Sequence, residues 1–371
     1  MKTLGIVGGG QLALMMAQAA KTLGIECVVL DPTPECPASA VARQVVGDFH
    51  DHATVLAFAK EAEVLTFEIE SANADALAEL AAQGLPVHPM PETLALIKDK
   101  LAQKNFLSER GIPVAPYQDA PDEEAARAAG EVLGYPFLLK ARSGGYDGRG
   151  NATINTPADI APAFAKLGTN LYAEGFVSFE KELAVVAVRT VAGDIRTYPV
   201  VETVHERHIC LEVLAPAPVK ESVRKKAETL AHYVLESFSG AGVFAIEMFM
   251  VDGDVLVNEI APRVHNSGHL TIEGCATSQF ENHVRAVMGM ELGSTELIAP
   301  AAVMLNILGE RTGPATPVGV EDAKALGGVA IHIYGKKETK PDRKMGHITA
   351  VANSLLEARA KAEDAWRRVS I

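Results

Sequence analysis

The sequence predicts a chain of mixed α/β and α+β structure, with a parallel sheet first, an α+β region in the middle and a small β-rich region at the end. Strand and helix patterns alternate over residues 1–98, which indicates a parallel sheet covered on both faces. Later segments alternate apolar and polar residues around Gly-Asp and Asp-Gly pairs, which is typical of antiparallel hairpins. At 371 residues the chain is long enough for several cores, and we expect domains at 1–98, 99–299 and 300–371.

The first region is expected to contain three strands, each followed by a helix. Glycine, proline or polar residues end each apolar run, and prolines 86, 89 and 91 close the region. The expected strands are 3–7, 26–30 and 64–69, and the expected helices are 11–23, 54–62 and 74–83.

The later elements follow from charge pattern, strand alternation and turn residues. A charged helix is expected at 98–110, and an apolar strand at 136–140 leads into a glycine-rich loop. The remaining expected elements are antiparallel strands at 182–191 and 194–201, a helix at 219–237, a hairpin of 243–251 with 255–260, short strands at 303–308, 330–334 and 346–351, and a closing helix at 354–367.

Composition and charge exclude several classes of function. The formal net charge is −13, so no broad basic face for nucleic acid can be assembled. No run approaches the roughly 18 apolar residues of a membrane span, and glycines interrupt the N-terminal apolar stretch, unlike a secretory signal. The four cysteines are scattered without a C-x-x-C pair, as in reduced proteins. We therefore expect a cytoplasmic protein without nucleic-acid or membrane partners.

The loop from Lys140 to Gly150 has a composition suited to a polyphosphate. It contains four glycines, which lack a Cβ and let backbone amides approach an anion closely. Lys140, Arg142 and Arg149 add positive charge. The loop differs from the phosphate loop of P-loop nucleotidases, because its lysine precedes the glycines. The alternative is a flexible glycine-rich hairpin without a ligand.

A second glycine motif, Gly8-Gly-Gly10-Gln-Leu-Ala13, lies between the first strand and the first helix. With Asp31 at the end of the next strand, it matches the dinucleotide-binding pattern and suggests an oxidoreductase. Glycines before a helix also form a general anion site, equally suited to a sugar phosphate. Because nothing after residue 100 resembles a hydride-transfer domain, we interpret the motif as structural.

Two acids indicate a metal site. Glu247 and Glu259 lie in the two strands of an expected hairpin, and pairing across Asp252-Gly253 would bring them together on one face. Two carboxylates among apolar neighbours repel each other and lose hydration. A Mg²⁺ ion bound to phosphate oxygens would offset both effects, and Asn258 adds a neutral oxygen. The alternative is two acids on a solvated face of the hairpin.

Further polar positions flank these acids. Glu174 ends an apolar strand, where it and nearby backbone groups could contact an adenine edge, and Glu182 could accept from ribose hydroxyls. Each could equally be a solvated surface glutamate. Arg263 and His265 lie in a polar turn directly after Glu259, and a cationic fork at that position suits a small oxyanion.

Together these motifs resemble the ATP-grasp superfamily, and within it the 5-(carboxyamino)imidazole ribonucleotide synthetase family of purine biosynthesis. The resemblance covers nearly the whole chain and implies an N-terminal Rossmann-like sheet, a central ATP-grasp domain and a small β-rich C-terminal domain. The motifs that carry it are Gly8-Gly-Gly-Gln-Leu12, Leu65-Thr-Phe-Glu-Ile-Glu70, Gly144-Gly-Tyr-Asp-Gly-Arg-Gly150, Asn258-Glu-Ile-Ala-Pro-Arg-Val-His-Asn-Ser-Gly-His269, Tyr334-Gly-Lys336 and Arg343-Lys-Met-Gly-His347.

The resemblance implies roles for individual residues. ATP would be bound by Lys100, Lys140, Gly145, Tyr146, Asp147, Gly148, Arg149, Gly150, Asn151, Glu174, Gly175, Phe176, Val177, Glu182, His205, Asn258 and Glu259. Mg²⁺ would be bound by Glu247 and Glu259. The residues implied around bicarbonate and the aminoimidazole ribonucleotide are Tyr146, Asp147, Arg149, Arg263, His265, Lys336 and Arg343, and those that would help to hold this nucleotide are Gln11, Glu68 and Glu70. The chain departs from the family pattern at Lys100, where arginine also occurs, and at Thr203, where asparagine is frequent.

The implied reaction begins when bicarbonate attacks the γ-phosphate of ATP, giving carboxyphosphate and ADP, and ends with carboxylation of the 5-amine. Related enzymes are commonly dimers, so a homodimer is expected. Three alternatives remain: a biotin carboxylase, a formate-dependent glycinamide ribonucleotide transformylase, and a non-catalytic nucleotide-binding regulator. The glycine loop and the motif at 343–347 favour the imidazole enzyme, and intact Lys140, Glu247 and Glu259 argue against a regulator.

Overall fold

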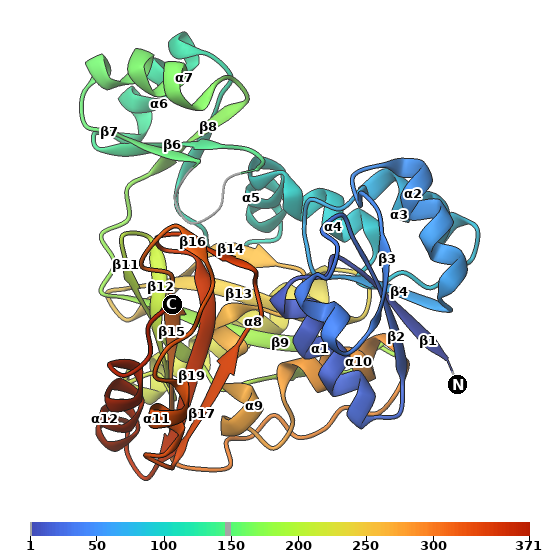
Figure 1. Ribbon diagram of the computed structural model, residues 1–371. Helices are drawn as coiled ribbons and strands as arrows, with labels where there is room; N and C mark the ends of the chain where they lie inside the picture. The colour runs from blue at the N-terminus through green and yellow to red at the C-terminus, as the bar shows by residue number, and fades with distance from the viewer. Residues whose placement is uncertain (1, 145–149) are drawn as a thin grey trace.

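The computed structural model describes residues 2–144 and 150–371, and its first unit is a four-stranded sheet (Figure 1). Its order is β3-β2-β1-β4, formed by β1 (Thr3–Val7), β2 (Glu26–Asp31), β3 (Arg43–Val46) and β4 (Val64–Phe67). Every pairing is parallel, which confirms the sheet predicted from strand–helix alternation. The sequence does not predict β3, because this edge strand is partly exposed and lacks a clear apolar pattern.

The helices of this unit lie close to their predicted positions. They are α1 (Gln11–Thr22), α2 (His52–Phe58) and α3 (Ala74–Ala82). Met15 and Met16 of α1 share a core with Phe280 and Val284 of α10 (Gln279–Val287). This packing joins the first unit to the central region.

The predicted charged helix at 98–110 is wrong in its first turn, because Asp99 separates two helices. Asp99 has an extended backbone and ends α4 (Pro91–Lys98). Its carboxylate accepts from the backbone N–H groups of Leu101 and Ala102, at 3.0 and 3.1 Å, and so caps α5 (Lys100–Glu109). The break sets the direction of α5, which carries Lys100 at its first position.

A small antiparallel unit stands away from the rest of the molecule (Figure 1). Its core contains Phe137, Leu139, Ile154 and Leu171. The strands, in the order β5-β8-β6-β7, are β5 (Tyr117–Ala120), β6 (Phe137–Ala141), β7 (Asn151–Ile154) and β8 (Leu171–Gly175), and the helices are α6 (Glu123–Leu133) and α7 (Ile160–Leu167).

The central sheet has nine strands and includes the long strands of the C-terminal region. Its order is β14-β13-β9-β11-β12-β15-β19-β17, and β10 pairs with β9. The strands are β9 (Lys181–Arg189), β10 (Ile195–Thr197), β11 (Val201–Glu206), β12 (Ile209–Ala215), β13 (Gly242–Val251), β14 (Asp254–Ala261), β15 (Ala301–Leu308), β17 (Val329–Ile333) and β19 (Lys344–Ala352). A separate short pair is formed by β16 (Gly313–Pro314) and β18 (Glu338–Thr339). The predicted hairpins are confirmed in their pairing, since β10 pairs with β9 and β14 with β13. The strand predicted at 194–201 is too long, because β10 ends at Thr197 and Val201 begins the separate strand β11.

Helices pack against the central sheet at several points. Val223, Ala227 and Leu235 of α8 (Glu221–Ser237) share a core with Val185 and Phe244 of the sheet. The remaining helices are α9 (Thr271–Gly274), α11 (Val320–Lys324) and α12 (Leu355–Trp366). Within the described part of the chain, no helix combines the length and apolar character needed to cross a bilayer.

A buried histidine connects the first sheet to the central sheet. His283 of α10 has Thr66 Oγ1 of β4 at 2.8 Å from Nε2, and its Nδ1 accepts from the Val243 backbone N–H at 3.1 Å. Burial, and then the proximity of His88, lower the pKa of His283 to about 3. The folded protein therefore holds this ring neutral at a pH where an unfolded histidine takes up a proton.

We expect the free energy of unfolding to fall as the pH drops below about 6.5, with His283 contributing about 2 kcal/mol of the loss by pH 5. The sign follows because the unfolded chain binds the proton first. Urea unfolding of the parent and of His283→Gln between pH 5 and 8 measures this contribution. The exposed His232→Gln is the control, and an equal pH slope in the parent and His283→Gln would contradict the assignment.

Candidate active site

The N-terminal glycine turn is filled by carboxylates of the protein itself. Glu68 accepts from the backbone N–H groups of Gly10 and Ala13, at 2.8 and 3.3 Å, and Asp31 accepts from Gly9 N–H at 2.9 Å. A Cβ at Gly8 would lie 2.6 Å from Glu68 Cγ, and one at Gly10 would lie 2.8 Å from Glu68 Oε1. The glycines are therefore needed to admit Glu68.

This geometry decides between the two interpretations of the turn, an anion-binding site and a structural motif. A dinucleotide or sugar phosphate would need the same N–H groups at the start of α1. Glu68 and Asp31 already satisfy these donors, which argues against a dinucleotide or sugar phosphate at the turn and agrees with the structural interpretation of the motif. Gln11, the first residue of α1, directly follows the glycine turn and is partly buried.

Glu247 and Glu259 face each other across β13 and β14, as the hairpin prediction required. The register shifts directly after this pair, so Asn258 is an extra residue on β14 and two residues oppose Glu247. The buried Asn258 Oδ1 has no hydrogen-bond partner in the described structure. Three oxygen-bearing side chains thus meet at one bulge.

The charges at this bulge are unequal. Burial, and then the neighbouring Glu259, raise the pKa of Glu247 to about 7. Burial also acts to raise the pKa of Glu259, but Lys100 more than offsets it and the net shift is downward. Lys100 Nζ lies 2.9 and 3.0 Å from the two Glu259 oxygens. Two adjacent carboxylates and an unpaired amide oxygen fit a hard divalent cation such as Mg²⁺.

Cationic and imidazole side chains border the two acids. Arg263 lies 2.9 Å from Glu70, an ion pair that connects the turn after β14 to the end of β4. His265 Nδ1 accepts from the Ser267 backbone N–H at 3.3 Å, which places the proton of a neutral ring on Nε2, 3.4 Å from Glu247. Burial, and then Arg263, lower the pKa of His265 well below its usual value. His265 is therefore a neutral donor.

The predicted ribose contact, Glu182, forms an ion pair with another predicted residue. His205 Nδ1 lies 2.8 Å from Glu182 Oε2. Burial tends to lower the pKa of His205, but Glu182 reverses the shift and raises it. Glu182, and more weakly Glu247, therefore favour the protonated form of His205.

Glu174 is not a solvated surface residue, which was the alternative left open for it. It is 2% exposed and lies 2.8 Å from Lys140 Nζ and 2.8 Å from Lys104 Nζ. Burial acts to raise its pKa, but Lys140 and Lys104 lower it to about 2. The sequence analysis missed Lys104, although it lies one turn after Lys100 on the same face of α5.

Glu174, Lys140 and Lys104 form a buried triad, which we call the Glu174 triad. Other residues implied to bind the nucleotide lie at the end of β8 and at the start of β7. Gly175 is buried at the end of β8, Phe176 is 54% exposed and Val177 follows it. Asn151 is the cross-strand partner of Lys140, and the Gly150 carbonyl accepts from Ala141 N–H at 2.8 Å. The predicted residues Gly145, Tyr146, Asp147, Gly148 and Arg149 lie outside the described residues. Arg142, assigned to phosphate charge from the sequence, instead forms an ion pair with Asp99.

Lys336 and Arg343 lie in the segment between β17 and β19. Lys336 Nζ donates to the Lys344 carbonyl at 2.6 Å, and Arg343 Nη1 donates to the Glu338 carbonyl at 2.7 Å. Burial, and then Arg343, lower the pKa of Lys336 to about 7. An anion bound beside Lys336 would raise this pKa and restore its full charge.

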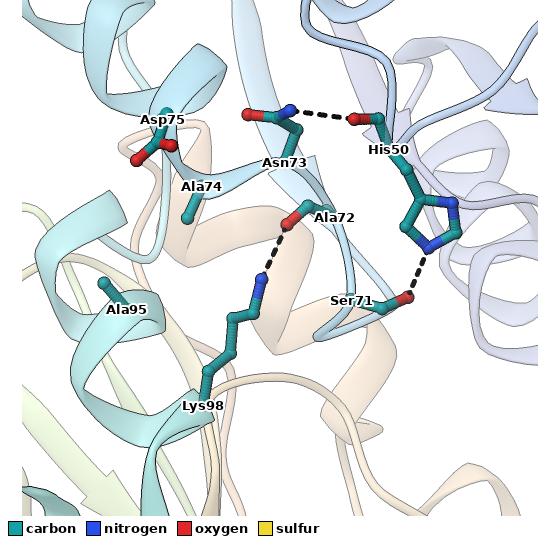
Figure 2. Close-up of a pocket in the computed structure, with 8 residues that line it drawn as sticks. All are labelled: His50, Ser71, Ala72, Asn73, Ala74, Asp75, Ala95 and Lys98. Atoms are coloured by element: carbon teal, nitrogen blue, oxygen red, sulfur yellow. Dashed lines mark hydrogen bonds between the residues drawn. The ribbon is translucent and has the colours of Figure 1, made fainter. Parts of the chain in front are cut away.

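A polar hollow of about 370 Å³ is lined by residues 71–75 and by parts of the first unit around them (Figure 2). In it Lys98 Nζ donates to the Ala72 carbonyl at 3.2 Å, and His50 Nε2 lies 3.3 Å from Ser71 Oγ. None of the residues that line it is among the predicted site residues: His50, Ser71, Ala72, Asn73, Ala74, Asp75, Ala95 and Lys98. The sequence analysis did not predict this hollow, because its lining residues come from three separate segments: His50, residues 71–75, and Ala95 with Lys98 on α4.

Three family models match successive parts of the chain. Residues 1–98 match the ribonucleotide synthetase preATP-grasp domain, residues 105–280 the ATP-grasp domain, and residues 302–361 the phosphoribosylaminoimidazole carboxylase C-terminal domain.

Named relatives and solved structures agree with these matches. The N5-carboxyaminoimidazole ribonucleotide synthase of Synechococcus elongatus is 39% identical over 93% of this chain and 88% of its own. The phosphoribosylaminoimidazole carboxylase of Ogataea methanolica is 44% identical over 96% of this chain, which spans about two thirds of that longer protein. The crystal structure of N5-carboxyaminoimidazole ribonucleotide synthetase from Thermotoga maritima has a TM-score of 0.91 at 44% identity, covering 100% of this chain and 99% of its own. The Aspergillus clavatus enzyme, in complex with ADP and 5-aminoimidazole ribonucleotide, has a TM-score of 0.91 at 38% identity, covering 99% of each chain.

The Glu174 triad gives a stability prediction. Glu174→Gln leaves two buried ammonium groups without a counter-charge, and we expect it to lower the free energy of unfolding by about 3–5 kcal/mol. Tyr172→Phe is the matched control, because Tyr172 Oη is 3.4 Å from the same carboxylate and carries no charge there. Urea unfolding at neutral pH compares the two variants. Equal losses would show that the triad contributes no more than ordinary packing.

Proposed function

The chain belongs to the N5-carboxyaminoimidazole ribonucleotide synthetase family of ATP-grasp enzymes, and on this premise we propose that it uses ATP and bicarbonate to carboxylate the 5-amino group of 5-aminoimidazole ribonucleotide. The products are 5-(carboxyamino)imidazole ribonucleotide, ADP and phosphate, in de novo purine biosynthesis. The observation that carries the proposal is the opposed pair Glu247 and Glu259, bordered by Lys100, Arg263 and His265.

The phosphate groups of ATP bind between the two lysine-bearing elements. Lys100 and Lys140 are each held by a carboxylate, Glu259 and Glu174, which fixes their ammonium groups in position. When ATP binds, phosphate oxygens share these cations. Mg²⁺ held by Glu247, Glu259 and Asn258 would supply further charge compensation for the transferring phosphoryl group.

Bicarbonate is activated by phosphorylation. One of its oxygens attacks the γ-phosphorus, the bond to the bridging oxygen of ADP breaks, and carboxyphosphate forms. Arg263 and the Nε2–H of His265 stabilise negative charge on the carboxyl oxygens by hydrogen bonds. The 5-amine nitrogen then attacks the carboxyl carbon of carboxyphosphate, or of CO₂ released from it. Phosphate leaves and the amine loses one proton.

The ribonucleotide lies between the first unit and the C-terminal segment. Glu70 and Arg263 already connect the end of β4 with the turn after β14, and Lys336 is close enough to Glu68 for their charges to interact. Gln11 and Glu70 contact the ribonucleotide from one side, and Lys336 and Arg343 contact its phosphate or carboxyl group from the other. Homodimeric assembly, as expected from related enzymes, and a cytoplasmic location belong to the same proposal.

The substrate test is ADP release from the full-length protein with each acceptor. Aminoimidazole ribonucleotide with bicarbonate should give coupled ADP and product formation. Glycinamide ribonucleotide with formate should not exceed the rate without an acceptor. Faster ADP release with formate would replace this function by the transformylase, and binding of ATP without turnover under every condition would indicate a regulator.

Glu259→Gln tests the acidic pair. We expect carboxylation to fall at least about a hundredfold, because the variant loses one carboxylate of the metal site and the partner of Lys100. Thermal unfolding should stay near that of the parent, since repulsion of Glu247 is relieved. The exposed Glu206→Gln on β11 is the control. Normal activity with unchanged Mg²⁺ dependence would make both acids structural.

Lys336→Met tests the C-terminal segment. Carboxylation should fall strongly, on the order of a hundredfold, while ATP affinity stays near the parent value, because Lys336 lies outside the ATP-binding residues. Lys340→Met is the matched control, since Lys340 is exposed in the same segment. Steady-state kinetics and ATP titration measure the two effects. If Lys336→Met carboxylates as fast as the Lys340→Met control, this segment only covers the site.

A further inference from the structure

A group of imidazole and carboxylate side chains lies outside the acidic pair. It consists of Glu273 on α9, His332 on β17 and His347 on β19, and we name it the Glu273 cluster. One ligand atom of each residue lies within 4.8 Å of those of the other two. It is the one such group of three found among residues 2–144 and 150–371.

The sheet register brings the two histidines together. His332 and His347 are cross-strand partners, and their rings stack at 4.5 Å with an interplanar angle of 13°. His332 Nε2 lies 2.7 Å from Glu273 Oε1, which joins α9 to the sheet. The ring centroid of a third histidine, His269, lies 5.0 Å from that of His347.

The remaining polar atoms of the group are buried and unpaired. Glu273 Oε2, His347 Nε2 and His269 Nε2 have no hydrogen-bond partner in the described structure. His347 is fully buried and His269 is 1% exposed. A buried polar atom left without a partner destabilises the fold. Their gathering at one place points to a shared partner.

A proton is not that partner. Burial, and then the neighbouring His269, lower the pKa of His347 well below its usual value. Burial, and then Lys344, lower the pKa of His269 to about 3. Both rings are therefore neutral at physiological pH, which is the form that binds a metal ion. Tyr334 Oη, 2.9 Å from His347 Nδ1, can accept a hydrogen bond from Nδ1–H, which keeps the ring proton on Nδ1 and leaves the Nε2 lone pair for a ligand bond.

We propose that Glu273, His332 and His347 bind one divalent transition-metal ion of the zinc class, with His269 as a neighbouring fourth donor. Imidazole nitrogens with a single carboxylate suit Zn²⁺, Co²⁺ or Ni²⁺, whereas Mg²⁺ prefers oxygen ligands only. This donor set therefore differs in chemistry from the oxygen atoms of Glu247, Glu259 and Asn258.

The proposed ion joins two regions of the chain. Glu273 follows the turn that carries Arg263 and His265, and His332 and His347 flank the segment that carries Lys336 and Arg343. Gln279 continues the connection, because it bonds both the backbone of His265 and the ring of His269. A metal at this point would fix two sides of the candidate active site relative to each other, and its binding does not depend on the proposed reaction.

The test is metal binding by the full-length protein. Metal analysis after exposure to Zn²⁺ and removal of excess should give about one equivalent that millimolar Mg²⁺ does not displace, and Co²⁺ titration should give the visible absorption of a nitrogen-coordinated site. Glu273→Gln and His332→Gln should each weaken Zn²⁺ binding at least about a hundredfold. They should also remove the Zn²⁺-dependent rise in melting temperature.

His50→Gln is the matched control, since His50 is an exposed histidine of the first unit and should leave Zn²⁺ binding unchanged. Two variants are used so that a folding defect in one leaves the other to decide. Absence of stoichiometric Zn²⁺ from the parent would overturn the proposal. Parent-like Zn²⁺ affinity in either folded variant would also overturn it, and the group would then be a hydrogen-bonded support for Lys336.

Discussion

The two lysines of α5 hold the architecture around the candidate site together. Lys100 and Lys104 are one helical turn apart, and each pairs with a carboxylate on a different sheet, the partly buried Glu259 on the central sheet and the buried Glu174 on the small unit. Removing a carboxylate from water is favourable only when a close cation compensates it. The direction of α5, set by the break at Asp99, therefore determines where both acids can be buried.

The same requirement for compensation operates at the end of the first sheet. Glu68 is partly buried and accepts from backbone N–H groups at the start of α1, and Glu70 pairs with Arg263 from the central region. The segment 68–70 is therefore bonded through Glu68 to the start of α1 and through Glu70 to the central region. The glycines of the N-terminal turn serve this packing, because any side chain at Gly8 or Gly10 would collide with Glu68.

The C-terminal strands are joined to the central region by sheet pairing rather than by ion pairs. β15 and β19 continue the central sheet beyond β12, so the segment with Lys336 and Arg343 is carried by the same framework as the acidic pair. The Glu273 cluster lies at the junction of these strands with α9.

Local patterns in the sequence determined the elements and some of their pairings. Strand–helix alternation predicted the parallel sheet, and the Asp252-Gly253 turn predicted the hairpin of β13 and β14. The register set by the turn would place Asn258 opposite Glu247, and the extra residue of the bulge is what brings Glu259 opposite Glu247. Tertiary structure alone decided the partners of Lys100 and Lys140, which are 159 and 34 residues away along the chain. It also decided the burial of Glu174 and the meeting of Glu273 with His332. Periodicity reports only whether a side chain faces inward, whereas the identity of its counter-charge depends on how separate elements pack.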